Sequence, residues 1–361
     1  YDLYNPDRIT RIKLYIKKVF ITEETVQLLP KFLRFVQGVV DSEDLPLNIS
    51  RETLQYNNAV AKIQKALVKK IFSELSKKDE NEPEEYLKFW DNFGPVLKEG
   101  LCEHNINNDE LLDICKFYTS KSKDKPISLK TYLDRKHDKQ EYIYYICSNS
   151  VEQADNSPQI EGFKEKDIEV LYLVDTVDDF WVTNTNKYKD FQFKSITRAN
   201  IDLDNLNATK EEKKEDDIVF DDEKKEIKTV DNNAEYDGLI KFFEETLSGM
   251  NIKNVKISKK LTSSPVCLVA DEMAMDIKLE RFLLEQKQIV APLARILEIN
   301  PNHKIIEYIN KNMNKKNLQD DLKDIIKTLY DESCIMEGEP VINPPEFAKR
   351  LNSMLNKFFN V

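Results

Sequence analysis

The sequence has few glycines and no long runs of apolar residues. Only seven of its 361 residues are glycine, and none belongs to a glycine-rich loop of the kind that cradles phosphate groups. We therefore expect this chain alone neither to bind nor to hydrolyse ATP. Its apolar runs are much shorter than the ~20 residues that a membrane-spanning helix needs, and no signal peptide precedes Tyr1. These absences predict a cytoplasmic protein with no membrane partner.

The sequence also lacks paired cysteines, paired histidines and an excess of basic residues. Its five cysteines are widely spaced and odd in number, which favours reduced, mostly buried thiols over disulfides or a zinc site. His104 and His137 have no second histidine or cysteine at a spacing suited to a metal ion, so we expect no metal. The net charge of −11 argues against nucleic acid as a partner, because a nucleic-acid surface needs clustered basic residues.

One stretch carries a pattern suited to binding an anion. After an acidic turn that contains Pro46, Asn48 and Ser50 offer side-chain oxygens that can cap a new helix. Arg51 then lies at the helix start, and Gln55 follows one turn later on the same face. A guanidinium and an amide placed in this way can reach one phosphate together. The alternative is that Arg51 pairs with the acidic turn before it and only tightens the loop.

The residues from Val39 to Gln55, with several other segments, resemble the middle domain of the heat-shock protein 90 chaperone family. The other segments are Lys13 to Thr22, Lys65 to Lys70 and Phe89 to Phe93, and the resemblance continues to the C-terminus. It implies that Arg51 crosses to the γ-phosphate of ATP held by a separate N-terminal domain, and that Gln55 assists. ATP and Mg²⁺ are then cofactors of the full-length protein, with none expected in this chain.

Two features of the chain ends refine this resemblance. Tyr1 is no natural start, so we expect the chain to be a fragment that lacks the ATP-binding domain. The last helix is not followed by the acidic Met-Glu-Glu-Val-Asp tail of eukaryotic cytosolic family members or by a Lys-Asp-Glu-Leu retention signal. We therefore expect the bacterial branch of the family, without partners that bind such a tail.

The apolar patterns predict a multidomain protein of the α/β and α+β classes. We expect αβ modules of the middle domain joined by a helical coil, followed by a mixed αβ C-terminal domain that ends in a dimerising helix pair. The expected segments are residues 1–125 (the catalytic-loop part and helical coil), 126–205 (a second αβ unit), 206–234 (a charged linker) and 235–361 (the dimerisation domain). Strands at 141–147 and 168–174, with a helical crossover between them, predict a small, largely parallel sheet in the second unit.

Two segments are candidates for contact with client proteins. Trp181 follows an acidic loop, and it either caps the core or contacts clients, as the resemblance to bacterial family members implies. The segment from Asp271 to Glu285 contains Met273 and Ile277, and it resembles the amphipathic client-binding helix of the family's C-terminal domain. Methionine suits such a surface because it repacks against many partners, although a plain core helix explains part of the pattern.

The last two predicted helices, at 316–336 and 345–359, each have a broad apolar face. Two helices at a chain end cannot easily cover both faces, so a second copy that supplies the same pair would complete a four-helix bundle, as the family resemblance also implies. The residues predicted to form this homodimer interface are Leu322, Ile326, Leu329, Leu351, Leu355 and Phe358.

Between these regions, the run from Asn300 to His303 resembles a helix start of the same family. Asn300 is expected to cap the helix, Pro301 to occupy its first turn, and His303 to be structural.

Together these observations predict part of an ATP-dependent, dimeric molecular chaperone that remodels unfolded or partly folded client proteins. Other chaperones are further partners that the resemblance allows. One alternative is a non-catalytic dimeric scaffold that binds proteins through its C-terminal helices. A second alternative is an acidic enzyme that uses Asp41, Glu43 and Asp44, but nothing in that turn sets their protonation states apart as acid and base catalysis requires.

Overall fold

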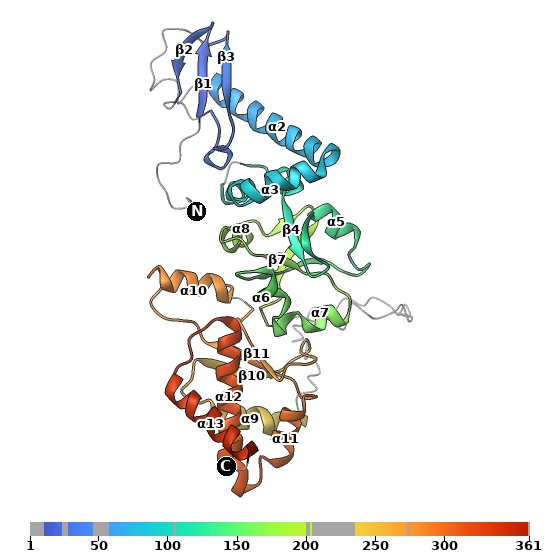
Figure 1. The fold of residues 1–361 in the computed structure, drawn as a ribbon, viewed down its shortest axis with the longest axis vertical. Helices are drawn as coiled ribbons and strands as arrows, with labels where there is room; N and C mark the ends of the chain where they lie inside the picture. The colour runs from blue at the N-terminus through green and yellow to red at the C-terminus, as the bar shows by residue number, and fades with distance from the viewer. Residues whose placement is uncertain are drawn as a thin grey trace, which may run out of the picture. The chain divides into compact units, whose positions relative to one another are not determined.

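The computed structural model describes residues 11–23, 28–45, 58–103, 106–199, 203, 235–272 and 274–359 (Figure 1). These residues form two compact units. The first comprises the chain up to Lys136 together with residues 141–143 and 171–194, and the second comprises residues 137–140, 144–170 and everything from Ser195 onward. Helices and three sheets alternate along the chain, so the predicted mixed α/β class is confirmed. The predicted linker, residues 206–234, lies outside the described residues. The boundaries between the four predicted segments stay a prediction.

The first unit begins with a three-stranded sheet. Strand β1 (Arg11–Ile16) runs antiparallel to β2 (Val19–Thr22) and parallel to β3 (Gln37–Ser42). Lys17 and Lys18 both have positive φ angles, which is the backbone twist that a two-residue hairpin turn needs. Alternate β1 side chains are buried, namely Ile12, Leu14 and Ile16, as the period-two pattern predicts.

One short helix, η1 (Lys31–Leu33), lies between β2 and β3 in the chain. The helices that follow the sheet are α2 (Asn58–Asn81), α3 (Pro83–Lys98), η2 (Glu99–Cys102) and α4 (Asn108–Ile114). Pro83 begins α3 because a proline needs no backbone N–H partner in the first helical turn. Tyr86 and Trp90 of α3 are both buried in the core of the first unit.

A six-stranded sheet comes next, with strand order β5-β4-β7-β6-β9-β8. Its strands are β4 (Lys116–Thr119), β5 (Ser122–Ser128), β6 (Tyr142–Cys147), β7 (Leu171–Leu173), β8 (Lys187–Tyr188) and β9 (Phe191–Ser195). The helices between them are α5 (Leu129–Asp134), α6 (Val151–Asp155), η3 (Pro158–Ile160), α7 (Glu161–Glu165) and α8 (Asp178–Asn184).

The two strands predicted in this region, β6 and β7, are confirmed as neighbours in the sheet. The expectation of a largely parallel sheet was wrong, because the pairs β4–β5, β4–β7 and β8–β9 are antiparallel. Two of these pairs are hairpins, whose two-residue connections permit only antiparallel pairing. The hairpins carry little signal in the sequence, so only the two strands that a crossover joins were predicted.

The C-terminal part of the second unit packs helices against a three-stranded sheet (Figure 1). Strand β12 (Arg295–Ile299) lies between β10 (Ile252–Ile257), which runs parallel to it, and β11 (Val266–Val269), which runs antiparallel. The helices are α9 (Asp237–Thr246), α10 (Ile277–Glu285), α11 (Lys304–Asn312), η6 (Lys316–Leu318), α12 (Gln319–Glu337) and α13 (Pro344–Phe359). Helices α12 and α13 confirm the predicted C-terminal helix pair. None of the helices in the described residues is long and apolar enough to span a bilayer.

Candidate functional site

The predicted phosphate-binding residues, Arg51 and Gln55, lie outside the described residues. The chain just before them is well anchored in the first unit. Strand β3 ends at Ser42, whose carbonyl accepts a hydrogen bond from the Lys17 N–H at 3.1 Å, and the Leu45 side chain is buried. Helix α2 is described from Asn58 onward. The role of Arg51 toward ATP stays a prediction.

The acidic turn before Arg51 gains no support as an enzyme site. Asp41, Glu43 and Asp44 are all exposed to solvent. The Asp41 carboxylate accepts a hydrogen bond from the Lys18 N–H at 3.1 Å, so it stabilises the β1–β2 turn. This local structural contact accounts for Asp41 without a catalytic role.

Trp181, one of the predicted client contacts, is completely buried in the first unit. Its indole N–H donates to Asp178 Oδ1 at 2.6 Å, and its ring packs against Phe117 and Phe193 with centroid distances of 5.9 and 5.3 Å. The prediction of client contact is therefore wrong for Trp181, and the alternative that it belongs to the core is confirmed. The acidic residues before it suggested a solvent-facing loop, but they face inward toward a lysine.

That lysine is Lys98, whose side chain is only 3% exposed. Its ammonium nitrogen lies 2.8 Å from Asp175 Oδ2 and 2.9 Å from Asp178 Oδ1, and Asp178 is fully buried. Burial disfavours the ammonium form, but the two carboxylates outweigh burial, so the pKa of Lys98 is raised. This buried charge cluster fixes the position of Trp181.

The second client segment is only partly described. Met273 lies outside the described residues, so its role stays a prediction. Ile277 is 2% exposed, and the prediction that it contacts clients is wrong for this structure. The reason is the cap of α10: Asp276 accepts from the Lys278 N–H at 3.1 Å, and its other oxygen accepts from the Ser195 and Thr197 hydroxyls. These bonds hold the first turn of α10 in the interior.

The exposed apolar residues of this region lie farther along, in the segment after α10. Val290 is fully exposed and Leu293 is 44% exposed. The base of the segment is fixed, because the Leu293 N–H donates to Glu280 Oε1 at 2.8 Å and the Leu293 carbonyl accepts from Asn251 Nδ2 at 2.9 Å. This segment was not among the residues predicted to contact clients. The uninterrupted apolar run at residues 289–294, directly after four polar residues, was the available signal.

Half of the predicted dimer residues belong to the chain's own core. Leu322, Ile326 and Leu329 on α12 are at most 4% exposed. They lie in one hydrophobic cluster with Phe243 of α9 and Leu297 of β12. The prediction that these three residues form a dimer interface is wrong, because the sheet and α9 already cover that face of α12.

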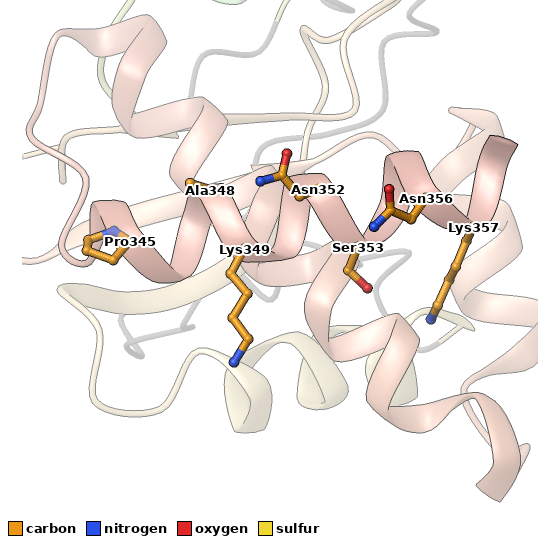
Figure 2. Close-up of a pocket in the computed structure, with 7 residues that line it drawn as sticks. All are labelled: Pro345, Ala348, Lys349, Asn352, Ser353, Asn356 and Lys357. Carbon is orange, nitrogen blue, oxygen red and sulfur yellow. The ribbon is translucent and has the colours of Figure 1, made fainter. Parts of the chain in front are cut away.

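Helix α13 presents the remaining predicted dimer residues. Leu351 and Leu355, one turn apart, are 41% and 46% exposed, and Phe359 continues the same face at 66% exposed. The helix also contains Phe358, whose side chain is not described. An open hollow of about 780 Å³ lies on the adjoining side of the helix. Figure 2 shows the polar and small side chains that line it: Pro345, Ala348, Lys349, Asn352, Ser353, Asn356 and Lys357.

Further apolar residues are exposed before α13, and the sequence analysis missed them. Ile335 and Met336 at the end of α12 and Ile342 in the connection are 52%, 42% and 59% exposed. An apolar stripe on α13 with polar residues beside it has the composition of a protein interface, in which an apolar centre is surrounded by a polar rim. Among the described residues, an exposed apolar stripe therefore runs along α13, and the apolar residues exposed on α12 lie at its C-terminal end.

His303 and Cys115 have structural surroundings. Helix α11 is capped by His303, whose Nδ1 accepts from the Ile305 N–H at 3.2 Å, so the expected structural role of His303 is confirmed. The expectation that Asn300 caps this helix was wrong, because its side chain closes a turn with the Asn302 N–H one residue before the cap.

Burial raises the pKa of Cys115 to about 12, which leaves that thiol unreactive at neutral pH. Among the described residues, no cluster of potential ligands is placed to hold a metal ion.

Comparison with known proteins agrees with the resemblance in the sequence. A family model described as "Hsp90 protein" matches residues 1–361. The chain is 48% identical over 357 residues to the "Chaperone protein HtpG" of Rickettsia bellii strain OSU 85-389 and to that of Rickettsia canadensis, and 46% identical to that of Rickettsia typhi. Each match covers 99% of this chain and 55% of the relative, so the chain spans about half the length of these relatives.

The chain belongs to the Hsp90 protein family, and its similarity to the Rickettsia chaperones supports the predicted bacterial branch.

Proposed function

We propose that the chain is the middle and C-terminal part of an ATP-dependent, dimeric chaperone that binds unfolded or partly folded proteins in the cytoplasm. The observation that carries the proposal is the family match over all 361 residues. Its relatives are nearly twice as long, which is compatible with an ATP-binding domain elsewhere in the parent protein. In that protein Arg51 reaches the γ-phosphate of Mg-ATP and Gln55 assists.

Two exposed apolar surfaces support the binding part of the proposal. One is the client surface, which we define as Val290 and Leu293. The other is the dimer stripe, defined as Leu351 and Leu355. Exposed apolar residues of this kind, gathered on one segment rather than scattered singly, are typical of protein interaction sites. The dimer stripe is continuous along one helix face and suits a second copy of the same helix. The segment that carries Val290 is not part of a helix or strand, so it suits partners of varied shape.

The role of Arg51 can be tested in a full-length protein that carries this chain. We expect Arg51→Ala to leave ATP affinity nearly unchanged and to lower turnover by roughly 10³-fold, because the guanidinium neutralises charge that develops in the transition state. Gln55→Ala should lower turnover less, since a neutral amide stabilises charge less well. Steady-state phosphate release and nucleotide titration measure the two effects. Normal turnover of Arg51→Ala would refute the assignment and favour the non-catalytic scaffold.

The client surface makes a second prediction. Replacing Val290 and Leu293 together by Ser should weaken the suppression of a model protein's aggregation severalfold, with little change in Tm, because neither side chain is buried. Ile305→Ser is the matched control, since Ile305 is 39% exposed but lies on α11. Undiminished suppression by the double variant would rule out this surface.

Ile277→Ser and Trp181→Arg should instead lower Tm strongly, because both residues are buried.

A further inference from the structure

A buried guanidinium connects two parts of the second unit. Arg295, the first residue of β12, has a side chain that is only 2% exposed. Its Nη1 atom donates to Glu280 Oε2 of α10 at 2.8 Å. Its Nε and Nη2 atoms donate to Glu339 Oε1 at 2.8 and 2.5 Å. Arg295 thus joins α10 to the connection between α12 and α13, which comprises residues 338–343.

On the side of α10, these contacts reach the client surface. Glu280 is fully buried, and its second oxygen, Oε1, accepts from the Leu293 N–H at 2.8 Å. The Leu293 carbonyl accepts from Asn251 Nδ2 at 2.9 Å, and the Asn251 carbonyl accepts from the Arg295 N–H at 3.0 Å. All but one of residues 286–294 are exposed, and none of them belongs to a helix or strand. Both bonds that hold the Leu293 backbone therefore lead to Arg295.

On the other side, the contacts reach the helix that carries the dimer stripe. Glu339 lies two residues after the end of α12, and its side chain is 16% exposed. The connection that contains it leads directly into α13. Helix α13 is held against α12 by ion pairs of Arg350 with Asp331 and of Lys357 with Asp321. The position of Glu339 therefore depends on how α13 is placed.

A second guanidinium joins α10 to the same connection. Arg281 donates from Nη1 to the carbonyl oxygens of Glu337 and Gly338, both at 2.9 Å. Gly338 has a φ of +71°, and a Cβ atom there would collide with the Arg281 guanidinium. Helix α10 and the start of the connection therefore hold each other in place through two arginines.

Burial allows these contacts to transmit a displacement. Taking a buried guanidinium away from a carboxylate partner is strongly unfavourable, because water does not replace the lost contact. When Glu339 moves, Arg295 therefore follows it, and the bonds from Glu280 and Asn251 to the Leu293 backbone are strained. An exposed ion pair would exchange its partner for water at little cost and would transmit nothing.

We propose that the contacts Glu339–Arg295–Glu280, which we call the arginine relay, couple the client surface to the pairing of α13. This inference rests on the proposed function, because it needs both a client surface and a dimer. When α13 pairs with a second copy, the connection is restrained and the relay holds the Leu293 backbone in its bonded position. When α13 is unpaired, the connection and residues 286–294 loosen together. Clients therefore bind the dimer more tightly, and by reciprocity a bound client favours the dimer.

The test is amide hydrogen exchange in residues 286–294, measured on the whole chain as a dimer and as a monomer. The monomer is the double variant Leu351→Asp and Leu355→Asp, and light scattering confirms the mass of each sample. We expect residues 286–294 to exchange roughly 5-fold faster in the monomer, which is near the lower limit of typical couplings between two sites. Exchange reports the Leu293 N–H bond without any client, so a client that contacts both copies at once does not affect the result.

Substitutions of Glu339, made in both the dimer and the monomer, test whether the relay carries this difference. Glu339→Ala removes the acceptor of Nε and Nη2, and it should make exchange in residues 286–294 equally fast in dimer and monomer. Glu339→Gln should preserve the difference, because a single oxygen accepts both bonds and the amide still supplies one. Glu346→Ala is the matched control, since Glu346 is an exposed glutamate on α13, and it should behave like the unmutated protein.

The same variants predict how a client binds to the dimer. The probe is fluorescently labelled lactalbumin that has been reduced and carboxymethylated, so that it cannot refold. It should bind Glu339→Ala roughly 5-fold more weakly than the unmutated protein and should bind Glu339→Gln normally. Once Val290 and Leu293 are replaced by Ser, Glu339→Ala should have no further effect, because Glu339 acts through that surface.

Two results would overturn the relay while leaving the proposed function in place. One is equal exchange of residues 286–294 in a dimer and a monomer whose masses are confirmed. The other is a difference between dimer and monomer that survives Glu339→Ala, since a different path would then carry it. An unmutated protein that is already monomeric would instead refute the proposed dimer, and the coupling with it.

Discussion

Replacing Leu351 and Leu355 together by Asp is expected to convert a dimer into monomers that keep their helical content. Both side chains are more than 40% exposed in the single chain, so charges there do not disturb its own core. In a dimer they would be buried against apolar neighbours, and desolvating two unpaired carboxylates should raise the dissociation constant by roughly 100-fold or more. Sedimentation velocity over a range of concentrations measures the change, and circular dichroism checks the helices.

Two further variants make this result specific. Ile305→Asp introduces the same charge at an exposed apolar residue of α11, and it should leave the dimer intact. Ile326→Asp lies on α12, where the residue is completely buried in the chain's own core, and it should unfold the second unit rather than produce folded monomers. Dimers of normal affinity in the Leu351 and Leu355 double variant would exclude α13 as the interface.

The second large effect is expected in the first unit, where Asp178→Ala should lower the free energy of unfolding by about 3–5 kcal/mol. The change removes one carboxylate of a buried cluster and leaves the Lys98 ammonium, 3% exposed, with only Asp175. It also takes away the acceptor of the Trp181 indole N–H. The indole N–H is then buried without its acceptor, and the buried ammonium keeps one carboxylate instead of two, which costs far more than losing the same contacts at the surface.

Chemical denaturation followed by tryptophan fluorescence measures this effect. The two tryptophans, Trp90 and Trp181, both belong to the first unit, so the signal reports that unit alone. Glu74→Ala is the control, because Glu74 pairs with Lys70 on the exposed surface of α2 and its removal should change the midpoint little. If Asp178→Ala and Glu74→Ala shifted the midpoint equally, the buried charges would not be essential for this unit.

The elements that the sequence predicted well are those with a strong local signal. The three-and-four spacing of apolar residues in α12 and α13 is a property of short segments, and the structure contains these helices close to their predicted limits. Family membership was equally accessible, because it depends on runs of consecutive residues such as those from Val39 to Gln55. Short hairpins such as β4–β5 carry a weaker signal, so the sheet was predicted with too few strands.

The predictions of site residues were wrong where a local sequence pattern does not show which residue a side chain contacts. An apolar face on α12 predicts that another element packs against it, but only the tertiary structure identifies α9 and β12 as the elements that cover Ile326. Trp181 next to acidic residues suggested solvent, whereas Asp178 faces a lysine far away in the sequence. The Arg295–Glu339 contact joins residues 44 positions apart, and no local pattern indicates it.

The most direct test of the proposed assembly is the mass of the unmutated protein in solution. Light scattering coupled to size exclusion at tens of micromolar should give twice the 42.3 kDa of a single chain. An obligate interface buries roughly 2,000 Å² or more, so dissociation at this concentration is not expected. A mass near 42.3 kDa would contradict self-association through α13 and, with it, the dimeric chaperone proposed for this chain.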